Sequence, residues 1–202
     1  MLFRSAFRML PEAVWKAPPM GTFNLHASLL PDYRGAAPIN WAVINGETET
    51  GITTFFLQQE IDTGAIIFRE KLAIGPDESA GELHDRLMQA GASLVVKTVD
   101  AIASGKIQPV AQSTLMTSGT ELHGAPKLNR TNTRIDWNQT TAVVHNLIRG
   151  LSPYPAAYTE LNFTDQKPPV LFKIYRTAAV KGFPHSNPPG SIETDNRQQL
   201  KV

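Results

Sequence analysis

The feature that most constrains the fold is a long amphipathic segment at residues 79–104. Ser79 and Glu82 have the spacing of a capping box at a helix start, and Gly105 is a typical helix stop. Between these ends apolar residues recur at helical spacing: Leu83, Leu87, Leu94, Val95, Val99 and Ile102. The pattern therefore predicts one long helix whose apolar face needs a second layer to pack against.

Strand-like segments precede this helix and would supply that layer. Three stretches are rich in β-branched and aromatic residues: residues 22–26, 51–59 and 65–74. Between the first two, residues 37–45 predict a short helix, with Pro38 in its first turn and Gly46 just beyond its end. Strands that alternate with helices in this way predict an α/β sheet covered on both faces.

A second, smaller unit follows a stretch without apolar periodicity. From Gln108 to about Asn129 the sequence is rich in Ser, Thr, Gly and Pro, which is typical of a linker. A helix is then predicted at 140–151 and strands at 156–163 and 169–180. We therefore predict a first domain at 1–110, a linker at 111–129 and a second domain at 130–202. The chain enters an apolar pattern at once and stops at LKV in mid-pattern, so we expect both domains to be incomplete.

The composition excludes several kinds of chemistry. The chain has 202 residues and no cysteine, so disulfides and thiolate chemistry are both excluded, and a cytoplasmic location is compatible with this. No apolar run approaches the ~18 residues that a membrane span needs. The five histidines form no HxxxH or HxH pair, so we predict no metal site.

The net charge of +1 conceals an asymmetry between the two halves of the chain. Residues 1–105 carry 8 basic and 12 acidic side chains, whereas residues 106–202 carry 11 and 6. A basic half can indicate a polyanionic partner such as nucleic acid. An ordinary uneven surface explains so small an excess equally well, and the composition leaves both interpretations open.

A pair of hydrogen-bonding side chains stands on the strand FNLH, residues 23–26. Successive side chains of a strand point to opposite faces, so Asn24 and His26 share one face. An amide and an imidazole aimed at one point suit the oxyanion that develops in acyl transfer. They lie at the end of a strand, where ligands bind in open α/β folds. A purely structural pair, with the amide capping a turn and the imidazole packed, remains the alternative.

A carboxylate follows the next strand, in the turn that contains Asp62, Thr63 and Gly64. This carboxylate could hydrogen-bond His26, favour the imidazolium form and relay a proton through water. Ordinary turn chemistry explains an aspartate before Thr-Gly equally well. Aspartic proteases also carry an Asp-Thr-Gly signature, but a single copy occurs here and Glu60 stands where that signature has a hydrophobic residue.

A longer string resembles the folate-dependent formyltransferase family. FNLHASLLPDYRGAAPINWAVINGETETG at 23–51, followed by IDTGAII at 61–67, is similar to that family's Asn-x-His pair, SLLPxxRG loop and later D-x-G turn. Within the family, AAPINW followed by IDTG resembles the enzymes that formylate methionyl-tRNA more than sugar-nucleotide formyltransferases or formyltetrahydrofolate hydrolase domains. The resemblance implies the C-terminal part of a Rossmann-like formyltransferase domain followed by a smaller OB-like β-barrel.

The resemblance also implies a reaction, in which the α-amine of initiator methionyl-tRNA takes a formyl group from 10-formyltetrahydrofolate. Asn24 and protonated His26 would stabilise the oxyanion, and Asp62 would keep His26 charged and assist proton transfer. The folate would lie against two segments, FRMLP at 7–11 and the loop after the first strand, whose implied binding residues are Arg8, Met9, Leu10, Ser28, Leu29, Leu30 and Pro31. Arg34 fits an anchor of its own loop better than a phosphate contact.

The basic second domain resembles the β-barrel that grips the acceptor arm of tRNA. The implied phosphate contacts are Lys127, Arg130, Arg134, Arg149, Lys173 and Arg176, although Arg149 fits a solvated helix residue equally well. We expect a cytoplasmic monomer with weak or no activity, because part of the supporting sheet is expected to be missing. An RNA-binding module without catalysis is the alternative reading.

Overall fold

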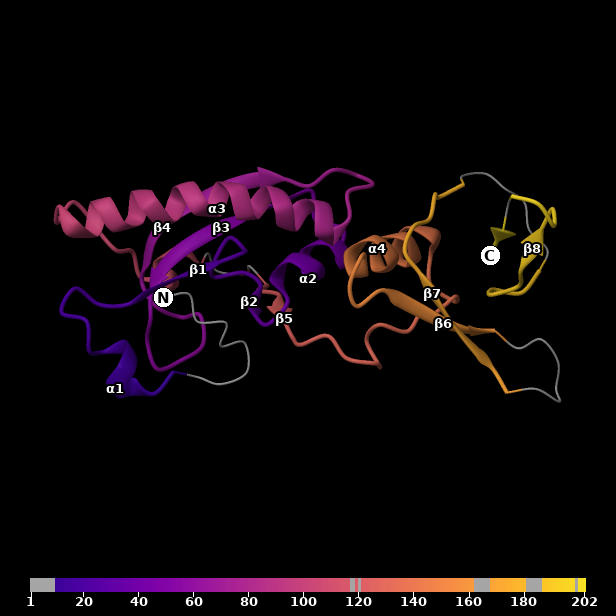
Figure 1. Cartoon of the computed structure of the whole chain (residues 1–202), viewed down its shortest axis with the longest axis horizontal. Coiled ribbons are helices and arrows are strands. Elements are labelled where there is room, and N and C mark those ends of the chain that lie inside the picture. Colours follow the sequence, from indigo (N-terminus) through magenta and orange to yellow (C-terminus); the bar gives the residue numbers. More distant parts are fainter. Residues whose placement is uncertain (1–9, 117–118, 120, 162–167, 181–186, 199) are drawn as a thin grey trace.

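The computed structural model describes residues 10–116, 119, 121–161, 168–180, 187–198 and 200–202, which form two units along the long axis of the molecule (Figure 1). The first unit contains α1 (Glu12–Trp15), β1 (Phe23–His26), β2 (Arg34–Gly35), α2 (Pro38–Ile44), β3 (Glu49–Phe56), β4 (Ile66–Ala73), α3 (Ala80–Ala103), the 3-10 helix η1 (Gln112–Leu115) and β5 (Gly124–Ala125). The second contains α4 (Thr141–Leu151), β6 (Ala157–Leu161), β7 (Val170–Ile174), β8 (Glu193–Thr194) and β9 (Leu200–Lys201). Among all the residues that the structure describes, no helix combines the length and apolarity that crossing a membrane requires.

The main sheet of the first unit has the order β1-β3-β4, with both pairs antiparallel. Asn24 lies opposite Phe55 and His26 opposite Thr53, so both polar residues of β1 face the same side as Phe55. On that side Leu30, from the loop after β1, packs against Phe55 and Ile66. The opposite side carries α3. The described sheet is therefore covered by α3 on one face and by a loop on the other.

The helix α3 confirms the predicted amphipathic segment, and it lies along the sheet (Figure 1). Its capping box forms as expected, with Ser79 and Glu82 exchanging side-chain and backbone hydrogen bonds. The buried face presents Leu83, Leu87 and Leu94, which join one core with Ile52 of β3 and with α2. This contact holds β3, and through it the strand β1, in a fixed position beneath the helix.

The segment predicted as a linker packs closely onto the first unit. Val110 forms an antiparallel bridge with Ile66 at the start of β4. Further on, β5 pairs in parallel with β2, and the indole nitrogen of Trp41 donates to the carbonyl oxygen of Pro126 at 2.7 Å. Through these contacts the described part of this segment packs against the loop that follows β1.

The second unit is built around α4. Ile148 and Leu151 of this helix are fully buried, together with Ala157 of β6. β6 and β7 form an antiparallel pair, and β8 and β9 form another. Within the described ranges these strands do not close into a barrel. Most of β7 is exposed, and only Ile174 at its end packs against the core.

The two units meet through α2 and α4. Gly150 of α4 approaches α2 so closely that a Cβ there would lie 2.6 Å from Cγ1 of Ile44, and Asn40 donates to the carbonyl oxygen of Gly150 at 2.8 Å. Arg149 is 7% exposed, and its guanidinium donates to the carbonyl oxygen of Glu78 at 2.9 Å. Burial lowers the pKa of Arg149. Arg149 is therefore not the solvated helix residue that the sequence allowed, and its guanidinium joins the units where a phosphate contact would need it exposed.

Candidate active site

His26 closes β1 and is only 6% exposed. Its Nε2 lies 2.9 Å from the carbonyl oxygen of Tyr33. A carbonyl oxygen can only accept, so Nε2 carries the hydrogen of this bond. The ring meets Phe55 edge-on at a centroid distance of 6.5 Å. These contacts fix the plane of the imidazole and turn Nδ1 toward the end of β3.

Asp62 faces that nitrogen from the turn between β3 and β4. Its Oδ2 lies 3.6 Å from Nδ1 of His26, and the two side chains are 12% and 7% exposed. The same oxygen accepts the backbone N–H of Gly35 at 3.1 Å. Asp62 has φ 55°, in the left-handed region that residues with a Cβ rarely adopt. The fold thus brings together two groups that are 36 positions apart in the sequence.

Asn24 lies on the same face of β1 as His26, two positions earlier along the strand. Unlike His26 it is exposed, and no hydrogen bond joins its amide to another residue in the described part of the chain. Its N–H groups are therefore available to a ligand at the edge of the sheet. The site combines a buried imidazole–carboxylate pair with one accessible amide.

Three consecutive residues after β1 support these groups. The carbonyl of Tyr33 holds His26, the side chain of Arg34 binds Gln112, and the N–H of Gly35 holds the Asp62 carboxylate. Gly35 has φ 129°, and a Cβ there would lie 2.4 Å from the carbonyl oxygen of Ala125. The glycine is thus required by both the backbone and the contact with β5. Arg34 anchors its own loop, as its sequence context favoured.

Gln112 is the residue at this site that the sequence reasoning missed. It lies in the predicted linker, and nothing in its immediate sequence distinguishes it from a solvated glutamine. In the structure it is 3% exposed, and its amide joins Arg34 to the turn of Asp62. The signal that could have found it is long-range, because its partners lie 78 and 50 positions earlier in the chain.

The ring of Tyr33 forms a second polar cluster behind the loop. Its hydroxyl donates to Oε1 of Glu47 at 2.7 Å and accepts from Asn45 at 3.0 Å. Burial, reinforced by the neighbouring Glu47 carboxylate, raises the pKa of Tyr33 well above its ordinary value. The ring stacks on His123 at a centroid distance of 5.1 Å, and His123 approaches Asp32. The loop that holds His26 is therefore anchored on its far side as well.

The predicted folate-binding residues have different environments. Ser28 and Leu30 are completely buried, and the Ser28 hydroxyl donates to the carbonyl oxygen of Asp32 at 2.6 Å. Leu29 is half-buried beside β3, and Pro31 is buried. Leu10 is half-buried, whereas Arg8 and Met9 lie outside the described residues. No group of three His, Cys, Asp or Glu side chains that could hold a metal occurs in the part of the chain that the structure describes.

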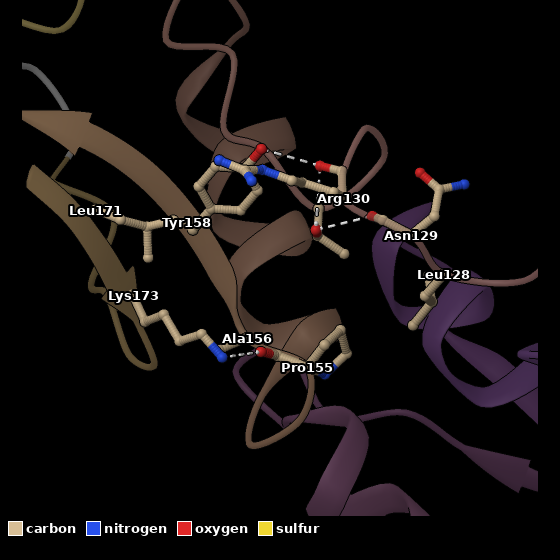
Figure 2. A pocket seen from close by; sticks show the side chains of 9 residues that line it. Leu128, Asn129, Arg130, Pro155, Ala156, Tyr158, Leu171 and Lys173 are labelled. Atoms are coloured by element: carbon tan, nitrogen blue, oxygen red, sulfur yellow. Dashed lines mark hydrogen bonds between the residues drawn. The ribbon is translucent and has the colours of Figure 1, made fainter. Parts of the chain in front are cut away.

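A separate hollow of about 330 Å³ lies in the second unit (Figure 2). Tyr158 and Lys173 project into it from β6 and β7, and Arg130 lies 5.8 Å from the centroid of the Tyr158 ring. Arg130 and Arg134 share the carboxylate of Glu160, at 3.7 and 3.2 Å. Of the expected phosphate contacts, the exposed ones are Lys127, Arg130, Arg134, Lys173 and Arg176.

Comparison with known proteins defines the class to which this site belongs. Residues 3–99 match the family described as Formyl transferase, and residues 127–202 match Formyl transferase, C-terminal domain. The two matches together cover most of the chain, which therefore belongs to the formyl transferase family.

Relatives in this family carry a more specific name. A methionyl-tRNA formyltransferase of Phocaeicola vulgatus is 55% identical over 197 residues, which are 98% of this chain and 60% of that protein. The enzyme of the same name from Bacteroides thetaiotaomicron is 52% identical over the same proportions. The chain thus spans about 60% of the length of the curated relatives that it matches.

Solved structures share the fold. An N-formyltransferase of Helicobacter canadensis, in complex with folinic acid and dTDP-3-aminofucose, has a TM-score of 0.56 at 27% identity and aligns with 63% of this chain and 46% of its own. HypX of Aquifex aeolicus in complex with tetrahydrofolic acid has a TM-score of 0.62 at 21% identity, with 75% and 25% covered. At that identity HypX supports the fold alone.

Proposed function

We propose that this protein transfers a formyl group from 10-formyltetrahydrofolate to the α-amine of initiator methionyl-tRNA. The observation that carries the proposal is the buried His26–Asp62 pair beside the accessible amide of Asn24, in a chain of the formyl transferase family. The names of the most similar relatives support the choice of methionyl-tRNA as the acceptor. When bound, the folate supplies an activated formyl carbon for attack by the amine.

The donor set fits a carbonyl oxygen that gains negative charge. Asn24 offers N–H groups that no residue in the described ranges uses, and a protonated His26 offers Nδ1–H on the side that faces Asp62. Donors aimed at a developing oxyanion contribute roughly 3–4 kcal/mol each. In this proposal Asn24, His26 and Asp62 are the catalytic residues.

Asp62 has two roles in the proposed reaction. Its carboxylate stabilises the imidazolium of His26 across the 3.6 Å gap. It also receives the proton that the attacking amine must lose, directly or through water, and returns it to the departing folate nitrogen. The new amide bond forms as the bond between the formyl carbon and that nitrogen breaks, so no covalent enzyme intermediate is needed.

The proposal includes the finer details of the fold and of the folate site. We infer that the first unit is the C-terminal part of a Rossmann-like formyltransferase domain and that the second is part of an OB-like barrel. The folate would lie against the segment around Leu10 and the loop 28–31; because Ser28 and Leu30 are buried, that loop would contact it chiefly through its backbone. We also infer a monomer that acts in the cytoplasm.

The tRNA would lie across the second unit. Arg130 and Lys173 line the hollow of Figure 2. Arg134 lies nearby in the sense that it shares the carboxylate of Glu160 with Arg130. Phosphate contacts of this kind lose affinity steeply as salt rises. A methionyl-tRNA affinity that is unchanged between about 50 and 200 mM salt would contradict this placement.

A single-turnover assay tests the proposed reaction. The chain is held in excess over methionyl-tRNA, and transfer of labelled formyl from 10-formyltetrahydrofolate is followed over time. We expect formylmethionyl-tRNA to form, and the rate to fall by about 10²–10³ in His26→Ala and in Asn24→Ala, because each variant removes one oxyanion donor. His84→Ala is the matched control, since His84 is exposed on α3 and, among the described residues, its side chain hydrogen-bonds only with Asp85.

Two results would overturn the proposal. One is no transfer to methionyl-tRNA at any enzyme concentration, because an excess of enzyme over methionyl-tRNA would reveal even the weak activity expected from the sequence. The other is a rate that His26→Ala and His84→Ala reduce equally. Glycinamide ribonucleotide and an aminosugar nucleotide are tested as acceptors in parallel, the latter because the Helicobacter canadensis neighbour is in complex with dTDP-3-aminofucose. Faster transfer to the sugar nucleotide would replace methionyl-tRNA with that acceptor.

A further inference from the structure

Gln112 uses its whole hydrogen-bonding capacity at the candidate active site. Its Nε2 donates to the carbonyl oxygens of Asp62 at 2.7 Å and Gly64 at 2.9 Å. Its Oε1 accepts from Nε and Nη2 of Arg34 at 3.0 and 2.5 Å. Carbonyls can only accept and a guanidinium can only donate, so these partners permit one orientation of the amide. A buried amide with four satisfied positions is rigid.

The two carbonyls that Gln112 binds belong to a turn that needs support. Asp62 has φ 55°, which costs an L-residue about 1–2 kcal/mol relative to the right-handed region. Such a conformation persists only where the surroundings fix it. On one side Gly64 packs so tightly that a Cβ there would lie 1.6 Å from the carbonyl oxygen of Phe56. On the other side Gln112 holds the turn.

The same short strand supports both active-site side chains. Arg34 binds Gln112, and Gly35 donates its N–H to the Asp62 carboxylate. Tyr33, one position earlier, holds Nε2 of His26. Residues 33–35 thus hold three groups in place: the carboxylate of Asp62, the imidazole of His26 and, through Gln112, the backbone of Asp62. The separation between His26 and Asp62 depends on these links, and Gln112 provides the one that reaches the Asp62 backbone.

We propose that Gln112 is a positioning residue that sets the direction of the Asp62 carboxylate toward His26. It does not touch the reacting atoms; it acts by holding the backbone from which that carboxylate projects. The expected effect of Gln112 on formyl transfer rests on the proposed function, whereas its expected effect on the direction of the Asp62 carboxylate does not. A merely structural glutamine would stabilise the fold without changing how Asp62 is directed.

Hydrogen exchange at one amide tests the geometric consequence without any activity. The N–H of Gly35 is bonded to the Asp62 carboxylate, so its protection reports where that carboxylate lies. In Gln112→Glu, which keeps an acceptor for Arg34 but loses both donors, we expect the Gly35 amide to exchange at least about 10-fold faster. The amide of Ile74, bonded to Thr48 in the same unit, should be unchanged.

Two comparisons make this experiment decisive. Gln89→Glu alters an exposed glutamine on α3 and should leave the Gly35 amide unaffected. Asp62→Ala removes the acceptor and should give the fastest exchange at Gly35. Two results for Gln112→Glu would overturn the positioning role. Unchanged exchange at Gly35 would show that the Asp62 carboxylate has not moved. Equally faster exchange at Gly35 and Ile74 would show a general loss of stability.

Formyl transfer then tests the catalytic consequence. A displacement of about 1 Å at a reacting group can cost 10²-fold in rate, so we expect kcat in Gln112→Ala to fall by about 10–100-fold with KM changed less than about 3-fold. In an Asp62→Asn background, Gln112→Ala should lower kcat by less than about 2-fold, since both substitutions act through the Asp62 carboxylate. Equal losses in the two backgrounds would contradict the proposal. No transfer by the unaltered chain would contradict the proposed function alone, and Gly35 exchange would still decide the role of Gln112.

Discussion

Gly35 is the position at which one added methyl group probes the packing of the candidate active site most directly. Gly35→Ala has two costs. Its φ of 129° lies in a region that residues with a Cβ rarely adopt, which costs about 1–3 kcal/mol. The new Cβ would also lie 2.4 Å from the carbonyl oxygen of Ala125, which is backbone and cannot rotate away.

Relief of that contact requires β5 to move away from β2. The same Ala125 carbonyl accepts the N–H of Ala36 at 2.7 Å, so the movement also weakens that hydrogen bond, at about 1 kcal/mol. We therefore expect Gly35→Ala to lower the free energy of unfolding by about 3–5 kcal/mol. Gly105→Ala isolates the conformational part, because Gly105 has φ 65° with no atom within 4 Å of its Cβ position; its cost should be about 1–2 kcal/mol.

Urea unfolding, followed by tryptophan fluorescence, measures both variants. With a slope of about 2–3 kcal/mol/M for a chain of this size, the midpoint for Gly35→Ala should fall by about 1–2 M. The Gly105→Ala midpoint should fall by less than about 1 M. Equal shifts for the two variants would refute the reasoning, because they would mean that the contact with Ala125 contributes nothing beyond the backbone angle.

Four further predictions concern helix ends and the junction of the units. Ser79→Ala should lower stability at neutral pH by about 1 kcal/mol, measured by urea unfolding, because it removes the N-cap of α3. Hydrogen bonds from Ser79 lower the pKa of Glu82. The stabilisation by the Glu82 carboxylate is therefore fully present above the ordinary glutamate pKa and is lost as the pH falls through the lower pKa of the folded state. Glu82→Gln should flatten that part of the curve of unfolding free energy against pH. Arg149→Leu should lower the free energy of unfolding by about 2–4 kcal/mol, measured by thermal or urea unfolding, and should barely change the salt dependence of tRNA binding. Arg130→Ala should barely change stability but should weaken that salt dependence. Gly150→Ala should cost about 1–3 kcal/mol, because a methyl group there meets the backbone of α2; an unchanged melting curve would contradict this.

The local part of the structure was predictable from the sequence. The capping box and apolar period of α3, and the strands β1, β3 and β4, follow from signals within a few residues of one another. The alternation of β1 also showed that Asn24 and His26 share a face. These features depend on backbone period and capping, which neighbouring residues determine.

The parts that were missed depend on contacts between distant segments. Arg149 resembles an ordinary basic residue near a helix end, and only the approach of α4 to the loop before α3 buries it. Gln112 lies in a stretch without periodicity, and only the fold brings it to Arg34 and Asp62. The antiparallel order of the main sheet was also not readable from strand periodicity, because period 2 is common to both strand directions.

The close packing of the described residues between 110 and 126 onto the first unit determines where the protein can safely be divided. A cut after Val110, at the predicted end of the first domain, would discard both Gln112 and the strand that Gly35 packs against. A cut after Pro126, whose carbonyl oxygen accepts from Trp41, would keep every contact described for the candidate active site. A study of the first unit in isolation should therefore keep this stretch as part of that unit.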